Sequence, residues 1–354
     1  MNEDCLKLTS YFGERQRTAS NGFAADALLD LYGRRGIATS ILLRGAEGFG
    51  AGQRLRTDRS LSLSDDLPLT AVAVDTRSRI EGLLDSTADL LRSGLVTLER
   101  ARLLTGDLET VGPGEVPGEE TKLTVYVGRQ ERVYRVPAFV AVCDLLHRRG
   151  IAGATALLGV DGTAHGERER AAFFSRNAGT PMMVIAVGSG AQIARVLPER
   201  GGLLRQPLLT LERVRICKRD GELLGRPPTA GESPLDADET HLPPARKLMV
   251  YTSEAALHDG QPIHRAIVRR LRAAGISGAT TQRGMWGFHG DHPPHGDRLL
   301  QLGRHVPAVT IVIDTPERIQ AAFDIIDDLT AKQGLVTCET VPVTRQPAPG
   351  ARTV

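Results

Sequence analysis

Histidine and aspartate residues gather in one stretch of the chain, where their spacing could bind a metal ion. His289, Asp291, His292 and His295 lie close together in a polar segment. Imidazole nitrogen and carboxylate oxygen are ligands that suit zinc, nickel or iron. The spacing matches no established metal motif, and histidines of a polar loop are often solvated surface residues. The sequence therefore leaves a divalent-metal site and a solvated loop as alternatives.

Two glycine-rich motifs could bring backbone N–H groups close to a ligand. They read Arg44-Gly45-Ala46-Glu47-Gly48-Phe49-Gly50 and Arg283-Gly284-Met285-Trp286-Gly287-Phe288-His289-Gly290. Glycine permits left-handed backbone angles and the close approach of amides to a phosphate or an adenine edge. The alternative is a tight exit from a strand, which needs glycine and binds nothing. Arginine near each motif is suited to phosphate oxygens.

The whole chain is an internal triplicate of about a hundred residues per copy, which is one small domain each. Lys7-Leu8-Thr9-Ser10-Tyr11 returns as Lys122-Leu123-Thr124-Val125-Tyr126 and as Lys247-Leu248-Met249-Val250-Tyr251. Later in each copy, Leu95-Val96-Thr97-Leu98-Glu99 matches Leu208-Leu209-Thr210-Leu211-Glu212 and Leu335-Val336-Thr337-Cys338-Glu339. We predict repeat 1 at 1–105, a linker at 106–121, a degenerate repeat 2 at 122–217, a linker at 218–246, repeat 3 at 247–343 and a tail at 344–354.

Hydrophobic periodicity predicts the order βαββαβ in each repeat, which is the ferredoxin-like unit of the α+β class. Segments 69–74 and 309–313 are apolar at nearly every position, which predicts strands that are buried on both faces. Three such sheets could face one another around a pseudo-threefold axis, and three independent units are the alternative. Lys7, Thr9 and Tyr11 share a strand face, which we expect to lie between repeats. We expect this face to serve packing, with the lysine paired to an opposite charge, and a lysine that binds a ligand is the alternative.

Composition and missing sequence motifs argue against several classes of protein. A net charge of +2 from 44 basic and 42 acidic residues gives no basic field, so we expect no nucleic-acid partner. An apolar run of eighteen residues is missing, which argues against direct membrane insertion. The acidic start of the chain argues against a signal peptide and favours the cytoplasm. GxSxG, HExxH and Walker patterns are also missing, so we do not expect an enzyme.

The first motif, together with Ser64-Asp65-Asp66-Leu67-Pro68 and Gly94-Leu95-Val96-Thr97, resembles the uncharacterised PII-like family known as domain of unknown function 190, here in three tandem copies. That family is similar to the nitrogen-regulatory PII signalling proteins. PII proteins are trimers that bind adenine nucleotides in the clefts between subunits and reach partners through a long loop. The resemblance implies PII-like units that form an intramolecular pseudo-trimer, with the chain acting as a monomer.

The resemblance also implies the site residues. The loop-base contacts correspond to Gly48, Phe49 and Gly50 in repeat 1 and to Gly287, Phe288 and Gly290 in repeat 3. The phosphate-binding loop of PII corresponds to stretches that contain no lysine here, so arginine would have to meet a phosphate. The remaining predicted ligand-binding residues are Arg44, Glu47, Gly94, Thr97, Arg283, Gly334 and Thr337.

We therefore expect a regulatory protein that binds a small molecule, most of all an adenine nucleotide, and acts on a membrane transporter or an enzyme. The chief alternative is a metal or anion sensor that uses the His-rich loop of repeat 3. An enzyme of unknown reaction comes third.

Overall fold

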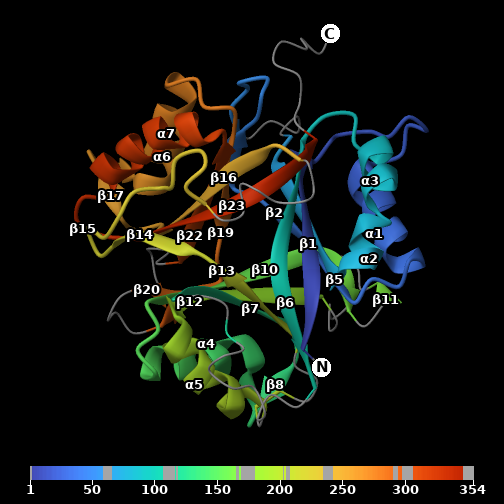
Figure 1. Cartoon of the computed structure of the whole chain (residues 1–354), viewed down its shortest axis with the longest axis horizontal. Coiled ribbons are helices and arrows are strands. Elements are labelled where there is room, and N and C mark those ends of the chain that lie inside the picture. The colour runs from blue at the N-terminus through green and yellow to red at the C-terminus, as the bar shows by residue number, and fades with distance from the viewer. Residues whose placement is uncertain are drawn as a thin grey trace.

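The three repeats contribute strands and helices in a common order (Figure 1). The computed structural model describes residues 2–58, 66–106, 116, 119–164, 167–168, 180–201, 203–204, 208–233, 242–289, 294–296 and 306–345. Repeat 1 contains β1 (Asn2–Gly13), α1 (Ala24–Arg34), β2 (Thr39–Arg44), β3 (Glu47–Phe49), β4 (Arg56–Thr57), β5 (Pro68–Thr76), α2 (Arg77–Glu81), α3 (Leu84–Leu90) and β6 (Leu95–Thr105).

Repeats 2 and 3 follow the same plan. Repeat 2 contains β7 (Glu120–Gly128), β8 (Arg132–Val133), β9 (Val136–Pro137), α4 (Ala138–Arg148), β10 (Gly153–Ala164), β11 (Glu167–Arg168), β12 (Pro181–Ser189), α5 (Gly190–Gly201) and β13 (Leu208–Arg213). The hairpin of β14 (Arg215–Arg219) and β15 (Glu222–Leu223) follows. Repeat 3 contains β16 (Pro244–Ser253), β17 (Leu257–His258), β18 (Gln261–Pro262), α6 (Ile263–Ala273), β19 (Ala279–Arg283), β20 (Trp286–His289), β21 (His295–Gly296), β22 (Pro307–Asp314), α7 (Pro316–Leu329) and β23 (Leu335–Arg345).

Local sequence explains the helix boundaries. Pro316 starts α7 at a position where its missing N–H costs nothing, and the Thr315 hydroxyl accepts a hydrogen bond from the Arg318 N–H. Between β5 and β6, where the order βαββαβ predicts one helix, the chain forms two, α2 and α3, with Gly82 directly after the first. Within the described parts of the chain, no helix is long and apolar enough to cross a membrane.

Strand pairing inside each repeat is antiparallel and uses four long strands. In repeat 1, β5 lies between β2 and β1, and β1 also pairs with β6. The corresponding orders are β10–β12–β7–β13 in repeat 2 and β19–β22–β16–β23 in repeat 3.

Pairing between repeats follows a cycle. Strand β3 of repeat 1 pairs with β19 of repeat 3, and β20 of repeat 3 pairs with β10 of repeat 2. The later part of β10 then pairs with β2 of repeat 1, which closes the cycle. Strand β6 also pairs with both β13 and β23, and β14 pairs with β23.

The predicted fold class, three ferredoxin-like units that pack as an intramolecular pseudo-trimer, is therefore wrong. The strands of all three repeats are hydrogen bonded into one sheet of 19 strands. The physical reason lies in the glycine motifs, which we interpreted as loop bases. Residues of the two motifs form β3 and β20, and the corresponding residues of repeat 2, 159–162, lie in the later part of β10. Backbone hydrogen bonds from these segments join the edges of the neighbouring repeats.

Four hydrophobic cores hold this sheet. Three of them lie between the sheet and the helices, one for each repeat, and Figure 1 shows these helices on the outside of the molecule. The fourth is central and draws residues from all three repeats. Strand β5 sends Ala71 and Ala73 to an outer core and Val72 and Val74 to the central one. The prediction that these strands are buried on both faces is confirmed, and the alternative of three independent units is wrong.

Glycine makes the pairing between repeats sterically possible. A Cβ on Gly48 would lie 2.6 Å from the carbonyl oxygen of Ala279 in the facing strand. A Cβ on Gly162 would overlap the carbonyl oxygen of Ser40, and one on Gly287 would overlap that of Ala154. Glycines of all three repeats, at corresponding positions, thus allow one backbone to approach another.

We expect Gly48→Ala to destabilise the protein by about 1–3 kcal/mol, because the added methyl group forces the β3–β19 pair apart. Gly50→Ala is the matched control, since no heavy atom lies within 4 Å of a Cβ at that position, and it should change stability by less than about 0.5 kcal/mol. Denaturant unfolding of both variants measures the difference. Equal stabilities would contradict the steric explanation.

Candidate functional site

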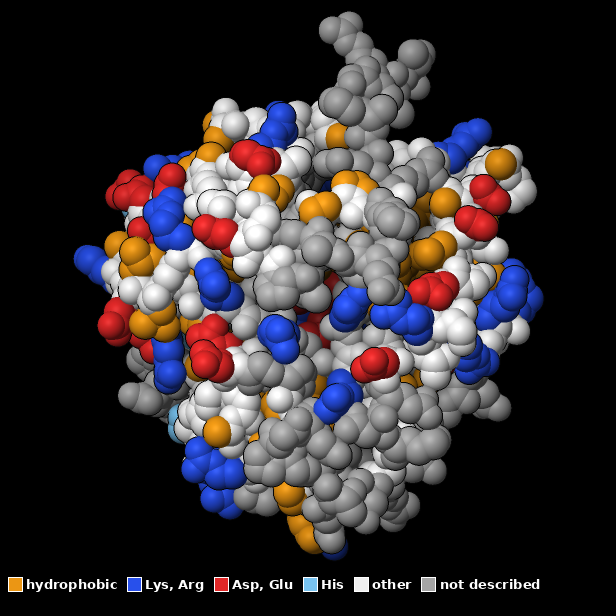
Figure 2. Space-filling view, viewed as in Figure 1, with side chains coloured by type: hydrophobic (Ala, Val, Ile, Leu, Met, Phe, Trp, Pro, Cys, Tyr) orange, Lys and Arg blue, Asp and Glu red, His pale blue; other side chains and the backbone are white. Residues whose placement is uncertain are grey.

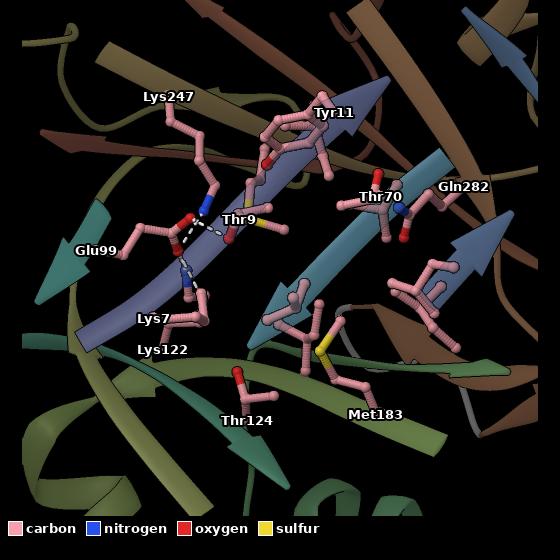
Figure 3. Close-up of a pocket in the computed structure, with 17 residues that line it drawn as sticks. Lys7, Thr9, Tyr11, Thr70, Glu99, Lys122, Thr124, Met183, Lys247 and Gln282 are labelled. Atoms are coloured by element: carbon pink, nitrogen blue, oxygen red, sulfur yellow. Dashed lines mark hydrogen bonds and ion pairs between the residues drawn. The ribbon is translucent and has the colours of Figure 1, made fainter. Parts of the chain in front are cut away.

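Six charged side chains meet at the centre of the molecule, and Lys7, Glu99, Lys122 and Lys247 among them are labelled in Figure 3. Each repeat supplies one lysine and one glutamate that lie directly opposite each other on paired strands: Lys7 and Glu99, Lys122 and Glu212, Lys247 and Glu339. All six residues are at least 94% buried. We call these residues the charge ring.

Lysine and glutamate alternate around the charge ring. The Nζ of Lys7 lies 2.5 Å from both Glu99 Oε2 and Glu212 Oε2. Lys122 Nζ lies 2.8 Å from Glu212 Oε2 and 2.6 Å from Glu339 Oε2. Lys247 Nζ closes the ring at 3.5 Å from Glu339 Oε2 and 2.8 Å from Glu99 Oε2. Each ammonium therefore joins the carboxylate of its own repeat to that of another repeat.

The electrostatics of the charge ring are uneven. Burial by itself disfavours every charge, but the neighbouring carboxylates raise the pKa of Lys7 and Lys247 above the usual lysine value. Burial prevails at Lys122, whose pKa is lowered despite Glu212 and Glu339. Burial opposes ionisation of Glu99 and Glu339, but the nearby lysines lower the pKa of both.

The sequence predicted half of this ring. The expectation that the repeated lysines pair in the interior between repeats is confirmed. We did not predict the glutamates, although comparison of the three repeats contained the signal. Segments 95–99, 208–212 and 335–339 correspond to one another, and each ends in glutamate, at Glu99, Glu212 and Glu339. These three carboxylates lie close enough together to hold a metal ion, but lysine ammonium groups already neutralise them.

A second group of charges lies where repeats 1 and 3 meet. This junction cluster comprises Glu47 and Asp58 of repeat 1 and Glu254, Arg265 and Arg283 of repeat 3. Arg283 lies 2.9 Å from Asp58 Oδ2 and 2.7 Å from Glu254 Oε1. Arg265, which is 94% buried on α6, lies 3.9 Å from both Asp58 Oδ1 and Glu47 Oε2. Burial opposes the charge of Arg283, but the two carboxylates raise its pKa.

The structure thus brings the predicted residues Glu47 and Arg283 together across a repeat boundary. Arg44 lies elsewhere, at 2.9 Å from Glu14 in a partly exposed pair. This pair corresponds to the contact between Arg283 and Glu254 in repeat 3. Gly48 pairs with Thr280 of β19. Gly50 directly follows β3 and has open space around it.

The predicted aromatic residues are buried in the cores of neighbouring repeats. Phe49 of repeat 1 belongs to the core around α6 of repeat 3, and Phe288 of repeat 3 belongs to the core of repeat 2. The ring of Phe288 stands edge-on to His147, with centroids 5.0 Å apart. These contacts give both phenylalanines a packing role, and their contact with a ligand stays a prediction.

The predicted phosphate-loop residues occupy the turns and strands beside the central core. Gly94 and Gly334 have φ values of +127° and +100°, angles that favour glycine, and they directly precede β6 and β23. Thr97 and Thr337 are fully buried, and the Thr97 hydroxyl donates to Glu99 Oε1 at 3.5 Å. No described contact links these residues to the junction cluster.

Part of the predicted metal site lies outside the described residues. Asp291 and His292 lie outside the described residues, as does Gly290 of the predicted ligand-binding set, whereas His289 and His295 are described. His289 ends β20 opposite Gly153 of repeat 2, and His295 in β21 lies opposite Gly287. The metal site therefore stays a prediction.

We expect Lys247→Met to cost about 3–5 kcal/mol of folding stability, because it leaves Glu99 and Glu339 short of a buried counter-charge. Arg270→Met is the control, since Arg270 forms an exposed pair with Asp328 on the surface and its loss should cost at most about 1 kcal/mol. Urea unfolding measures both values. A loss for Lys247→Met as small as for the control would show that the ring contributes little.

Acid should destabilise the protein through the same ring. The pKa of Glu99 and Glu339 is lower in the folded state than in the unfolded chain, where it is about 4.3. Their stabilisation is therefore present above that value and is lost as the pH falls through the lower folded-state pKa. We expect the free energy of unfolding to fall steeply below about pH 4. Glu339→Gln should make this fall shallower, and an unchanged slope would contradict the assignment.

Comparison with known proteins identifies the family. Residues 5–103, 120–216 and 245–343 each match the family DUF190, described as "Uncharacterized ACR, COG1993". A UPF0166 protein of Aquifex aeolicus (strain VF5) is 30% identical over 97 residues, which is 27% of this chain and 90% of that protein. That relative therefore corresponds in length to one repeat. The resemblance inferred from the glycine motif and its flanking residues is confirmed: the chain belongs to the DUF190 family and contains three tandem copies of its domain.

Proposed function

We propose that this protein is a PII-like cytoplasmic regulator, rather than an enzyme, that binds an adenine nucleotide at the junction of repeats 1 and 3. In this proposal the bound nucleotide controls contact with a protein partner, either a membrane transporter or an enzyme. The junction cluster carries the proposal, because it gathers two arginines and three carboxylates at a boundary between repeats.

The key observation is that Arg265 and Arg283 both face the carboxylate of Asp58. A carboxylate and a phosphate present similar oxygen acceptors to guanidinium groups, and arginine binds both with charge-assisted hydrogen bonds. Asp58 thus occupies the position that a phosphate oxygen would take. We propose that the phosphates of the nucleotide replace Asp58 between the two arginines.

The third residue of α6, compared with the third residues of α1 and α4, favours a phosphate site at one junction only. Arg265 is the third residue of α6, where α1 has Asp26 and α4 has Val140. Asp26 would repel a phosphate and Val140 cannot donate a hydrogen bond. The junction of repeats 1 and 3 is therefore the best equipped of the three for an anionic ligand.

Release of Asp58 offers a route from ligand to partner. Asp58 directly precedes segment 59–65, and the ion pair between Arg56 and Asp66, at 2.9 Å, joins the two sides of that segment. We propose that a nucleotide changes the contacts of Asp58 and thereby changes how the protein meets its partner. On the face shown in Figure 2, acidic and basic side chains are interspersed, which favours a protein partner over a polyanion.

Calorimetric titration of the intact chain with ATP, ADP and AMP tests the proposal. We expect one site per chain and an affinity at least about tenfold lower in Arg283→Gln, because a hydrogen bond to a charged group contributes about 1.5–3 kcal/mol. Arg270→Gln removes an exposed arginine of α6 and should bind as the parent does.

Two results would count against the proposal. One is equal affinity in Arg283→Gln and the parent protein, provided that thermal unfolding shows both to be folded. The other is the absence of any heat of binding with all three nucleotides.

A further inference from the structure

A small cavity adjoins the charge ring at the centre of the molecule (Figure 3). Its volume is about 30 Å³, and residues of all three repeats line it. Figure 3 shows Lys7, Lys247 and Glu99 on one side of the cavity, with Thr70 and Gln282 on the other. The cavity therefore connects the charge ring to a layer of side chains beyond it.

That layer is built from three equivalent cross-strand pairs, one in each repeat. They are Leu43 with Thr70, Leu157 with Met183, and Gln282 with Val309. All six side chains line the cavity. Gln282 and Thr70 are thus the polar exceptions in a layer that is otherwise apolar, and the equivalent positions show that apolar residues fit there.

These two polar groups face the cavity without protein partners. Gln282 and Thr70 are each 2% exposed. The amide Oε1 and Nε2 of Gln282 and the hydroxyl of Thr70 make no hydrogen bond within the part of the chain that the structure describes. Native proteins rarely leave such groups unsatisfied, and buried water is the usual partner where a polar cavity is large enough.

We propose that the central cavity is a hydration site, in which one or two water molecules bind to Gln282 and Thr70. A single water needs about 10–15 Å³ of such volume, so the cavity has room for about two. A water there needs two to four polar partners. The Gln282 amide and the Thr70 hydroxyl supply donors and acceptors, and the cavity also reaches Thr9, whose hydroxyl donates to Glu99 Oε1 at 2.9 Å.

This site would partly solvate the charge ring from inside the protein. Water near Thr9 and Glu99 lowers the cost of burying six charges, because it restores part of the hydration that folding removes. The hydration site shares no residue with the proposed nucleotide site, and Gln282 directly precedes Arg283 in β19.

A high-resolution crystal structure of the intact chain tests the proposal. We expect ordered water within hydrogen-bond distance of the Gln282 amide and the Thr70 hydroxyl. The double variant Gln282→Leu/Thr70→Val makes the layer fully apolar, with residue types that the equivalent positions already hold. It should lose this water and bind xenon under pressure, as dry apolar cavities do.

Thr310→Val is the matched control, because it removes a buried hydroxyl that pairs with Thr281. It should keep the central water and take up no xenon at this position. If the double variant fails to fold, nuclear Overhauser contacts between water and the side-chain amide protons of Gln282 in the parent protein decide the question.

The proposal is overturned if the cavity of the parent protein contains no ordered water. It is equally overturned if the Gln282 amide pairs with protein groups, or if the bound species is not water.

Discussion

The charge ring joins the three repeats through ion pairs that cross every boundary between them. A buried ammonium or carboxylate costs several kcal/mol unless an opposite charge accompanies it, and a single repeat offers each lysine one carboxylate. In the ring each lysine contacts two, one of them from another repeat. Three repeats placed in another mutual orientation would leave each buried charge with only the partner of its own repeat, so the ring favours this arrangement over others that apolar contacts alone would permit.

Strand pairing between repeats follows from the same arrangement. Once the lysine-bearing strands meet at the centre, the glycine motifs lie against the free strand edges of neighbouring repeats. Gly48 then permits backbone contact with the facing strand, and Phe49 and Phe288 enter the cores of the neighbours. Each repeat thus completes the sheet and the core of another. Removing one repeat would expose both a strand edge and an apolar surface.

Features that depend on a local sequence pattern could be predicted, whereas contacts between segments far apart in the sequence could not. Unbroken apolar strands such as 309–313 indicated burial on both faces, and the recurrent lysine indicated an interior position. Pairing of β3 with β19 joins residues more than two hundred positions apart, and no local periodicity encodes it. Glycines that serve such close approach look the same in sequence as glycines that bind phosphate. The ring glutamates were recurrent as well, but recurrence alone does not say which charges meet.

Fusion of three copies in one chain allows their sites to diverge while the frame stays symmetric. Lysine and glutamate recur at all six ring positions, because a change at any one would leave its two neighbours with a single partner each. Positions outside the ring carry no such restriction. Arg265 has Asp26 and Val140 as counterparts, and Gln282 has Leu43 and Leu157. Three identical chains could not place arginine or glutamine at one junction alone, so the single occurrence of Arg265 and of Gln282 depends on the fused arrangement.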